Sequence, residues 1–92
     1  MALRDRNKRV RNRAATSLVK LNQSFPELAP ILVGALEDED RNVRSKAAEG
    51  LGKVGKDFPT LTPAFVSALV AASMDRDAAV RSIAVEAALH DE

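Results

Sequence analysis

The sequence predicts an all-α solenoid, a stack of about two and a half helical hairpins. Two observations predict this fold class: the chain matches itself when it is shifted by 33 residues, and apolar residues recur at helical spacing in the matching segments. A period in the low thirties to forties is typical of stacked supersecondary units. No segment alternates apolar and polar residues with period two, so we expect no strands.

Identical residues define the repeat. Sixteen of the 35 residues from Ala2 to Leu36 recur 33 positions later; for example, Val10-Arg11 returns as Val43-Arg44. A third, partial copy that contains Val80-Arg81 follows at a spacing of 37. We place its four additional residues, about one helical turn, between Leu69 and Val80.

The second helix of each unit has the clearest signals. It is expected to begin after a residue whose side chain accepts from free backbone N–H groups, namely Asn7, Asp40 and Asp77. Its apolar face is formed by Val10, Ala14, Leu18 and Leu21 in the first copy and by Val43, Ala47, Leu51 and Val54 in the second. We expect these helices to end at Asn22 and Gly55, because both residue types tolerate a left-handed conformation.

The first helix of each hairpin contains proline. Ser24 and Glu27 have the spacing of a capping box, which predicts a helix start at Ser24. Pro30 and Pro63 lie deeper than the first turn, so they should kink these helices or delay their regular part.

The repeat frame divides the chain into a half repeat, residues 1–22, and two full repeats, residues 23–55 and 56–92. Met1-Ala2-Leu3 aligns with the last residues of a first helix, so the chain opens on a second helix. Roughly three repeats are usually needed for a stable stack. We therefore expect either a fragment of a longer solenoid or self-association through the uncovered first helix of the chain.

Residues 40–55 follow the pattern Asp-x-x-Val-Arg-x-x-Ala-Ala-x-x-Leu-Gly-x-x-Gly. This pattern resembles a HEAT repeat, in particular the bacterial, phycobilisome-lyase-like subclass. The first copy departs from it at Asn7, Val19 and Asn22, and the third ends in Ala87-Ala88-Leu89-His90. The resemblance implies a right-handed α–α superhelix that offers a binding surface. It also implies a ladder of charge-assisted hydrogen bonds between neighbouring repeats, formed by Arg11, Arg44, Arg81, Asp38, Asp40, Asp75 and Asp77.

The composition argues against catalysis. Cysteine is absent and His90 is the single histidine, which excludes disulfides, thiolate zinc sites and centres built on several histidines. We therefore expect no cofactor and no enzyme activity. Gly50, Gly52 and Gly55 have the spacing of a phosphate loop, but they fall near a helix end, where carbonyls are free. We interpret the first two as packing glycines. Without a secretory signal or an apolar stretch of membrane-spanning length, the expected location is cytoplasmic.

The polar face of the second helices is the candidate functional surface. It is basic in the first copy and mixed later, and the resemblance implies that partners bind there. Its candidate residues are Arg6, Arg9, Arg13, Lys20, Lys46, Glu49, Lys53, Ile83 and Glu86. Ile83 is apolar at a solvent position, which suggests cover by a repeat or a partner.

The expected function is a protein–protein interaction scaffold. Nucleic acid is an alternative partner, because clustered Lys and Arg neutralise phosphates, although the chain has no Tyr or Trp for stacking on bases. A bilin-lyase-like accessory role is a further alternative that rests on the resemblance alone.

Overall fold

The computed structural model describes residues 5–58, 60, 63 and 65–88. These residues form α1 (Lys8–Ser24), the 3-10 helix η2 (Pro26–Leu28), α2 (Ala29–Ala35), α3 (Arg41–Asp57), α4 (Val66–Ala72) and α5 (Ala78–Ala88). The part of the chain that is described contains helices and no strand, which confirms the all-α prediction.

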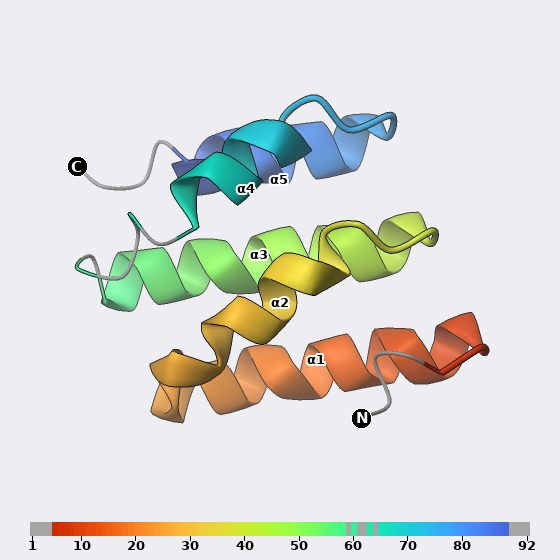
Figure 1. Ribbon diagram of the computed structural model, residues 1–92, viewed down its shortest axis with the longest axis horizontal. Helices are drawn as coiled ribbons and strands as arrows, with labels where there is room; N and C mark the ends of the chain where they lie inside the picture. Colours follow the sequence, from red (N-terminus) through yellow and green to blue (C-terminus); the bar gives the residue numbers. More distant parts are fainter. Residues whose placement is uncertain (1–4, 59, 61–62, 64, 89–92) are drawn as a thin grey trace.

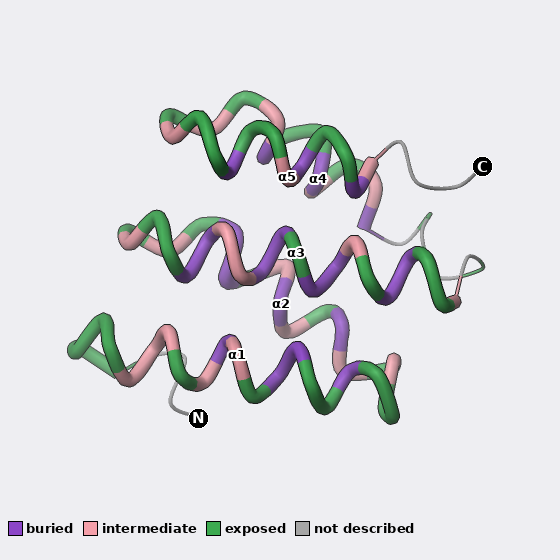
Figure 2. Tube along the Cα trace, turned by 180° about the vertical axis from the view of Figure 1, so that it is seen from behind, coloured by how far each residue is buried: buried purple, intermediate pink, exposed green. Residues whose placement is uncertain are grey.

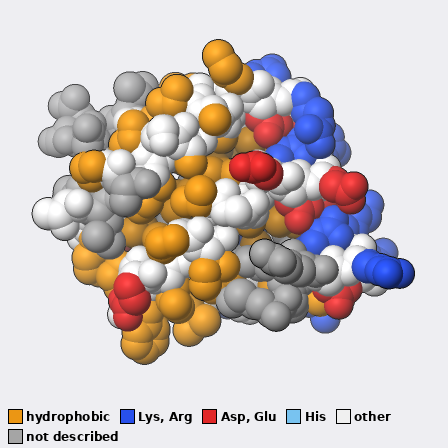
Figure 3. Space-filling model, in the orientation of Figure 1, with side chains coloured by type: hydrophobic (Ala, Val, Ile, Leu, Met, Phe, Trp, Pro, Cys, Tyr) orange, Lys and Arg blue, Asp and Glu red, His pale blue; other side chains and the backbone are white. Residues whose placement is uncertain are grey.

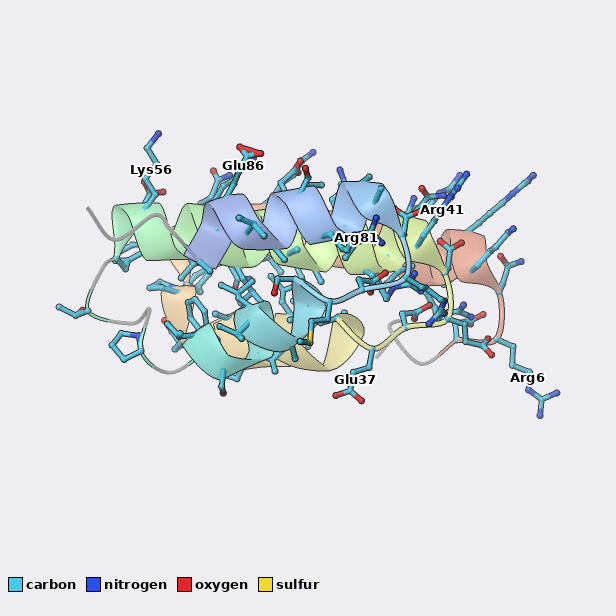
Figure 4. The ribbon with its side chains drawn as sticks, turned by 90° about the horizontal axis from the view of Figure 1, so that it is seen from above. Arg6, Glu37, Arg41, Lys56, Arg81 and Glu86 are labelled. Carbon is cyan, nitrogen blue, oxygen red and sulfur yellow. The ribbon has the colours of Figure 1, made fainter. Side chains whose placement is uncertain are left out.

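The helices form two layers. The long helices α1, α3 and α5 lie side by side in that order, and α2 and α4 lie across them on one side (Figure 1). Helix α3 packs against both α1 and α5, α2 packs on α3, and α4 packs on α5. Seen from above, the two layers are separate, with α4 and α2 on the same side of the long helices (Figure 4). This arrangement is a stack of helical hairpins, the solenoid that the repeat predicts.

The core lies between the two layers and along the contacts between long helices. Its fully buried large side chains include Leu32, Val43, Leu51, Leu69 and Val80. The predicted apolar face of α3 is buried throughout, down to Val54 at 2% exposure, whereas its counterpart in α1, Leu21, is 46% exposed. Figure 2 shows the same contrast along the three long helices. Helix α3 is buried from both sides because it has a neighbour on each.

The predicted caps at the starts of the long helices are confirmed. The side chain of Asn7 accepts from the backbone N–H of Arg9 at 2.8 Å, and that of Asp40 accepts from Val43 at 3.3 Å. Asp77 accepts from the backbone N–H groups of Ala79 and Val80 at 3.0 and 3.2 Å. A residue that accepts in this way satisfies N–H groups without an intrahelical partner, so it fixes the start of the helix.

The predicted ends of the long helices are wrong by two residues. Helices α1 and α3 continue to Ser24 and Asp57, and the N–H groups of Phe25 and Phe58 donate to Leu21 and Val54, each at 2.7 Å. Both phenylalanines precede a proline in the sequence, and a residue before proline is disfavoured in the helical region. Proline therefore ends these helices.

Asn22 and Gly55, the residues expected at these ends, are instead buried inside the helices. No glycine of the described residues has a positive φ, so none adopts the left-handed cap. The capping box is also wrong, because Ser24 is the last residue of α1 and η2 starts without a side-chain cap. The predicted delay of the regular helix is confirmed: α2 begins only after the 3-10 turn, with Pro30 in its first turn.

The four additional residues of the last repeat lie before α4 and not after it. Helices α2 and α4 match at a spacing of 37, with Leu32 and Leu69 both fully buried. The turns that follow match as well, since the backbone N–H of Asp38 donates to the carbonyl of Ala35 at 3.2 Å and that of Asp75 to the carbonyl of Ala72 at 3.0 Å. The insertion therefore falls between Phe58 and Val66, and the placement after Leu69 is wrong.

Two arginines of the long helices bridge consecutive hairpins. The Nε and Nη2 atoms of Arg11 donate to the carboxylate of Asp38 at 2.8 and 3.2 Å. The same atoms of Arg44 donate to Asp75 at 2.8 and 3.0 Å. Two parallel charge-assisted hydrogen bonds fix orientation as well as distance. Each pair thus sets the position of one hairpin against the next.

The third guanidinium nitrogen of each arginine, Nη1, donates to the turn of its own repeat. In Arg44 it donates to the carbonyls of Asp38 and Glu39 at 2.8 and 2.9 Å. In Arg11 it donates to the carbonyls of Asp5 and Arg6 at 3.0 and 2.9 Å. Each arginine therefore connects its own turn to the following turn of the stack.

Candidate partner-binding surface

A groove of about 540 Å³ lies between α3 and α5, and it is lined by Ala48, Glu49, Gly52, Lys53, Lys56, Ile83, Glu86 and Ala87. Its residues come from the long helices alone. Figure 4 shows Lys56 and Glu86 projecting from that layer, away from α2 and α4. The groove therefore opens on the outer side of the long helices, the side that Figure 2 presents to the viewer.

Small residues form the floor of the groove because the two helices approach closely there. A Cβ atom added to Gly52 would lie 3.1 Å from the Cβ of Ala87, closer than most side-chain contacts. Ala48 lies one turn earlier on the same face of α3. With no long side chain on this stripe, the space between the helices stays open above it.

Gly50 makes a similar approach on the other side of α3. A Cβ atom there would meet Val19 Cγ2 at 2.6 Å and Leu32 Cδ1 at 2.9 Å. The interpretation of Gly50 and Gly52 as packing glycines is confirmed. Both lie inside α3, so their N–H groups belong to helical hydrogen bonds and do not form a phosphate cradle.

The groove combines an apolar floor with charged rims of both signs. Ile83 is half-buried against the core and supplies the largest apolar side chain of the lining. Lys53 and Lys56 lie on the α3 side and are exposed. Glu86 lies on α5 and is exposed as well. This arrangement suits a partner segment with an apolar side chain for the floor and charges for the rim.

The structure brings together four of the nine predicted partner-binding residues: Glu49, Lys53, Ile83 and Glu86. Lys46 lies beside them on α3, and its Nζ is 3.7 Å from Glu49 Oε1, where it forms an ion pair instead of lining the groove. The remaining residues lie elsewhere.

The basic candidates of the first copy do not line the groove. Arg9, Arg13 and Lys20 are exposed on α1, which contributes nothing to the groove. Arg6 lies in the turn before α1, and Figure 4 shows its side chain pointing away from the side on which Glu86 projects. Four of the candidates therefore line the groove over α3 and α5, and the exposed cations of α1 form a basic surface outside its lining.

Lys56 is the charged groove residue that sequence reasoning missed, beside the small residues Ala48, Gly52 and Ala87. Glu49, Lys53 and Lys56 are separated by four and three residues, so they share one helical face. This spacing indicates Lys56 as well, but the helix was expected to end at Gly55, one residue before it. Extending α3 to Asp57 places Lys56 on the rim.

Basic side chains gather at the edge where the three long helices begin, with acidic side chains among them (Figure 3). The exposed cations there include Arg9, Arg41, Arg76 and Arg81. One of the acidic residues forms an ion pair with these cations: Asp77 Oδ2 lies 3.6 Å from Arg41 Nη1. This edge is the end of the molecule at which the arginine–aspartate pairs lie.

The pairs also affect ionisation at this edge. Burial alone would raise the pKa of Asp75, but hydrogen bonds from Arg44 and from the Asp77 N–H, with the Arg44 charge, lower it overall. The hydrogen bond to Asp38 raises the pKa of Arg11, against the opposing effect of burial. The charged forms of the Arg11 guanidinium and the Asp75 carboxylate are therefore favoured.

A family model for HEAT repeats matches residues 1–89 of the chain. With its stacked hairpins, the chain belongs to the HEAT-repeat family. No curated protein and no solved structure matches it. The match is to HEAT repeats in general, so the bacterial, phycobilisome-lyase-like subclass stays a prediction.

Members of this family commonly mediate protein interactions and are generally non-catalytic. Among the described residues, no helix has the length and apolar character needed to cross a bilayer. Residues 5–58, 60, 63 and 65–88 contain no group of three or more His, Cys, Asp or Glu arranged to hold a metal ion. The cytoplasmic location expected from the sequence stays a prediction.

Proposed function

We propose that the chain is a non-catalytic interaction module that binds a segment of a protein partner in the groove between α3 and α5. The observation that carries this proposal is the groove itself, which has an apolar floor at Ile83 and Ala87 and exposed charges on both rims. Interfaces of this type place an apolar anchor in a central pocket and polar contacts around it.

The chemistry of the lining defines the partner segment. An apolar side chain would contact Ile83 and the small residues beside it. An acidic side chain next to that anchor would pair with Lys53 or Lys56 on the α3 rim, both of which are exposed. A rim charge contributes mainly to the rate and specificity of association, whereas the apolar anchor contributes most of the affinity.

The proposal is tested by affinity capture with two pairs of matched variants. Ile83→Asp places a charge on the floor, and Val85→Asp makes the same change at an exposed apolar residue of α5 outside the groove. Lys53→Glu reverses a rim charge, and Lys20→Glu does so at the equivalent position of α1. Circular dichroism checks that each variant keeps its helices.

We expect Ile83→Asp to weaken binding of the captured protein at least about tenfold, as truncation of a central anchor does. Lys53→Glu should weaken it less and reduce its salt dependence. Val85→Asp and Lys20→Glu should leave binding unchanged. Undiminished capture by both groove variants would contradict the proposal.

The basic surface of α1 supports nucleic acid as a second candidate partner. Arg9, Arg13 and Lys20 are exposed on that helix, and clustered cations bind phosphates in a strongly salt-dependent manner. Replacing Arg9 and Arg13 by Glu should remove any co-purifying nucleic acid and leave groove binding intact. If nucleic acid is lost and no protein depends on the groove, the second candidate replaces the first. The bilin-lyase-like accessory role stays a prediction.

A further inference from the structure

The arginine–aspartate pairs between hairpins have a regular form that extends to both ends of the described stack. In each complete pair, an arginine of one long helix donates two hydrogen bonds to the aspartate of the next turn. The pairs are Arg11 with Asp38 and Arg44 with Asp75. Arg81 and Asp5 occupy the equivalent positions at the two ends.

Arg81 is already oriented as half of such a pair. Its Nη1 donates to the carbonyl of Asp75 at 2.8 Å, as the Nη1 of Arg44 donates to the carbonyl of Asp38. Among residues 5–58, 60, 63 and 65–88, no partner contacts its Nε or Nη2, the atoms that bridge hairpins in the other two arginines. The residue is exposed. The Nε and Nη2 atoms of Arg81 are therefore two donors at the α5 end, on a side chain oriented as in the complete pairs.

Asp5 is oriented as the other half. Its Oδ1 accepts from the backbone N–H of Asn7 at 2.8 Å, as Asp38 accepts from Asp40 and Asp75 from Asp77, also at 2.8 Å. In the described part of the chain, no cation lies within ion-pair distance of its carboxylate. The Asp5 carboxylate is therefore an acceptor at the α1 end of the stack, oriented as in the complete pairs.

Apolar surface accompanies each half. At the α5 end, Val85 is 42% exposed, while Ala48, its counterpart in α3, is fully buried. Val70 of α4 is 52% exposed at the same end. At the α1 end, Leu21 is exposed where its counterpart Val54 is buried. The two ends thus carry the residue positions that repeats bury against each other inside the stack.

We infer that the α5 end of one copy of this chain binds the α1 end of a second copy, with Arg81 donating to Asp5 of that copy. The contact continues the interface already formed between α1, α3 and α5, with the same charge-assisted pair and the same apolar positions. Charge complementarity favours unlike ends over like ends, since one carries the cation and the other the anion.

A contact between unlike ends is heterologous, so each copy keeps a free end of each kind. Such contacts produce open chains or closed rings and do not stop at a dimer. The assembled species should therefore increase in size with concentration. The groove between α3 and α5 takes no part in the contact, so this inference is independent of the proposed function.

The test is sedimentation velocity of the whole chain over a wide concentration range, with Asp5→Arg and Arg81→Asp as separate variants. Each variant alone has like charges at both ends, and we expect association at least about tenfold weaker than in the wild type. An equimolar mixture of the two variants restores opposite charges at every contact. The mixture should associate like the wild type.

Lys53→Glu serves as the control, because it also reverses a charge but lies on α3, away from both ends. It should associate like the wild type, and circular dichroism confirms that all variants fold. A wild type that stays monomeric at the highest concentration would overturn the inference, and the ends would then belong to another partner. Variants that associate alone as well as they do in the mixture would overturn it too.

Discussion

Arg44 and Arg81 occupy the same position in consecutive repeats, yet their surroundings differ. Arg44 is 3% exposed and donates to a carboxylate of the next hairpin as well as to the carbonyls of its own turn. Arg81 is exposed and makes only the contact with its own turn among the described residues. The sequence motif around both is the same Val-Arg pair after a capping aspartate.

The difference shows that a repeat motif specifies half of an interaction and that the neighbouring repeat supplies the rest. Burial of Arg44 follows from the presence of Asp75 and of the hairpin that carries it. At the end of the stack the same side chain is left on the surface. The position that stabilises the interior is therefore a binding position at the end.

The largest effect is expected from Arg44→Met, which removes the guanidinium but keeps an unbranched apolar stem. It leaves the Asp75 carboxylate, 8% exposed, without its cation. Breaking a buried pair by removing one partner costs several kcal/mol, so the free energy of unfolding should fall by about 3 kcal/mol. Urea denaturation followed by circular dichroism measures it. A change under about 1 kcal/mol would show that the pair does not hold the hairpins together.

The Arg44 pair also predicts a pH dependence of stability. Because the pKa of Asp75 is lowered in the folded state, its contribution is present above the unfolded value of about 3.9 and is lost as pH falls through the folded value. The stability difference between wild type and Asp75→Asn should therefore shrink below about pH 4. Urea titrations from pH 7 to lower pH measure this difference. A gap that stays constant over the whole range would contradict the prediction.

A smaller effect on stability is expected from replacing Gly50 of α3, which is compared with Gly34 of α2. Gly50→Ala should lower the free energy of unfolding by about 1 kcal/mol, since overpacking against Val19 and Leu32 outweighs the gain in helix propensity. Gly34→Ala is the matched control, with no atom within 4 Å of the new Cβ, and it should stabilise by about 0.5–1 kcal/mol. Thermal melts measure both variants. Equal shifts of the same sign would disprove the packing role of Gly50.

The smallest effect is expected from Arg81→Met. Its guanidinium is on the surface and donates only to a local carbonyl in the described structure. Surface substitutions of this kind usually change stability by no more than about 0.5 kcal/mol. The measurement is the same urea denaturation, at a concentration where the chain is monomeric. A loss as large as that of Arg44→Met would remove the contrast between the interior and the end.

The elements that local sequence determines were predictable. The caps at Asn7 and Asp40 and the helical spacing of the α3 core residues depend on neighbours a few positions away. The helix ends were missed because Gly55 was given more weight than the proline after Phe58. The insertion before α4 was misplaced because Ala68-Leu69 repeats Ala35-Leu36 in the sequence. In the structure the counterpart of Leu69 is Leu32, which is equally buried and has the same position in its helix.

The groove was predictable only in part. Glu49 and Lys53 follow from helical spacing on α3, and Ile83 follows from an apolar residue at a polar position. The depth of the groove depends on how closely α5 approaches α3 at Gly52 and Ala87, which is a tertiary distance that no local pattern contains.

The most direct test of the central claim, that the interior pairs hold consecutive hairpins together, is a double-mutant cycle between Arg44 and Asp75. The cycle uses Arg44→Met, Asp75→Asn and the double variant, and it measures the coupling free energy between the two side chains. A second cycle pairs Arg81→Met with Asp75→Asn, because Arg81 contacts only the backbone of that residue in the described structure. We predict a coupling of about 2 kcal/mol in the first cycle and close to zero in the second. Equal couplings in the two cycles, or none in the first, would contradict the account.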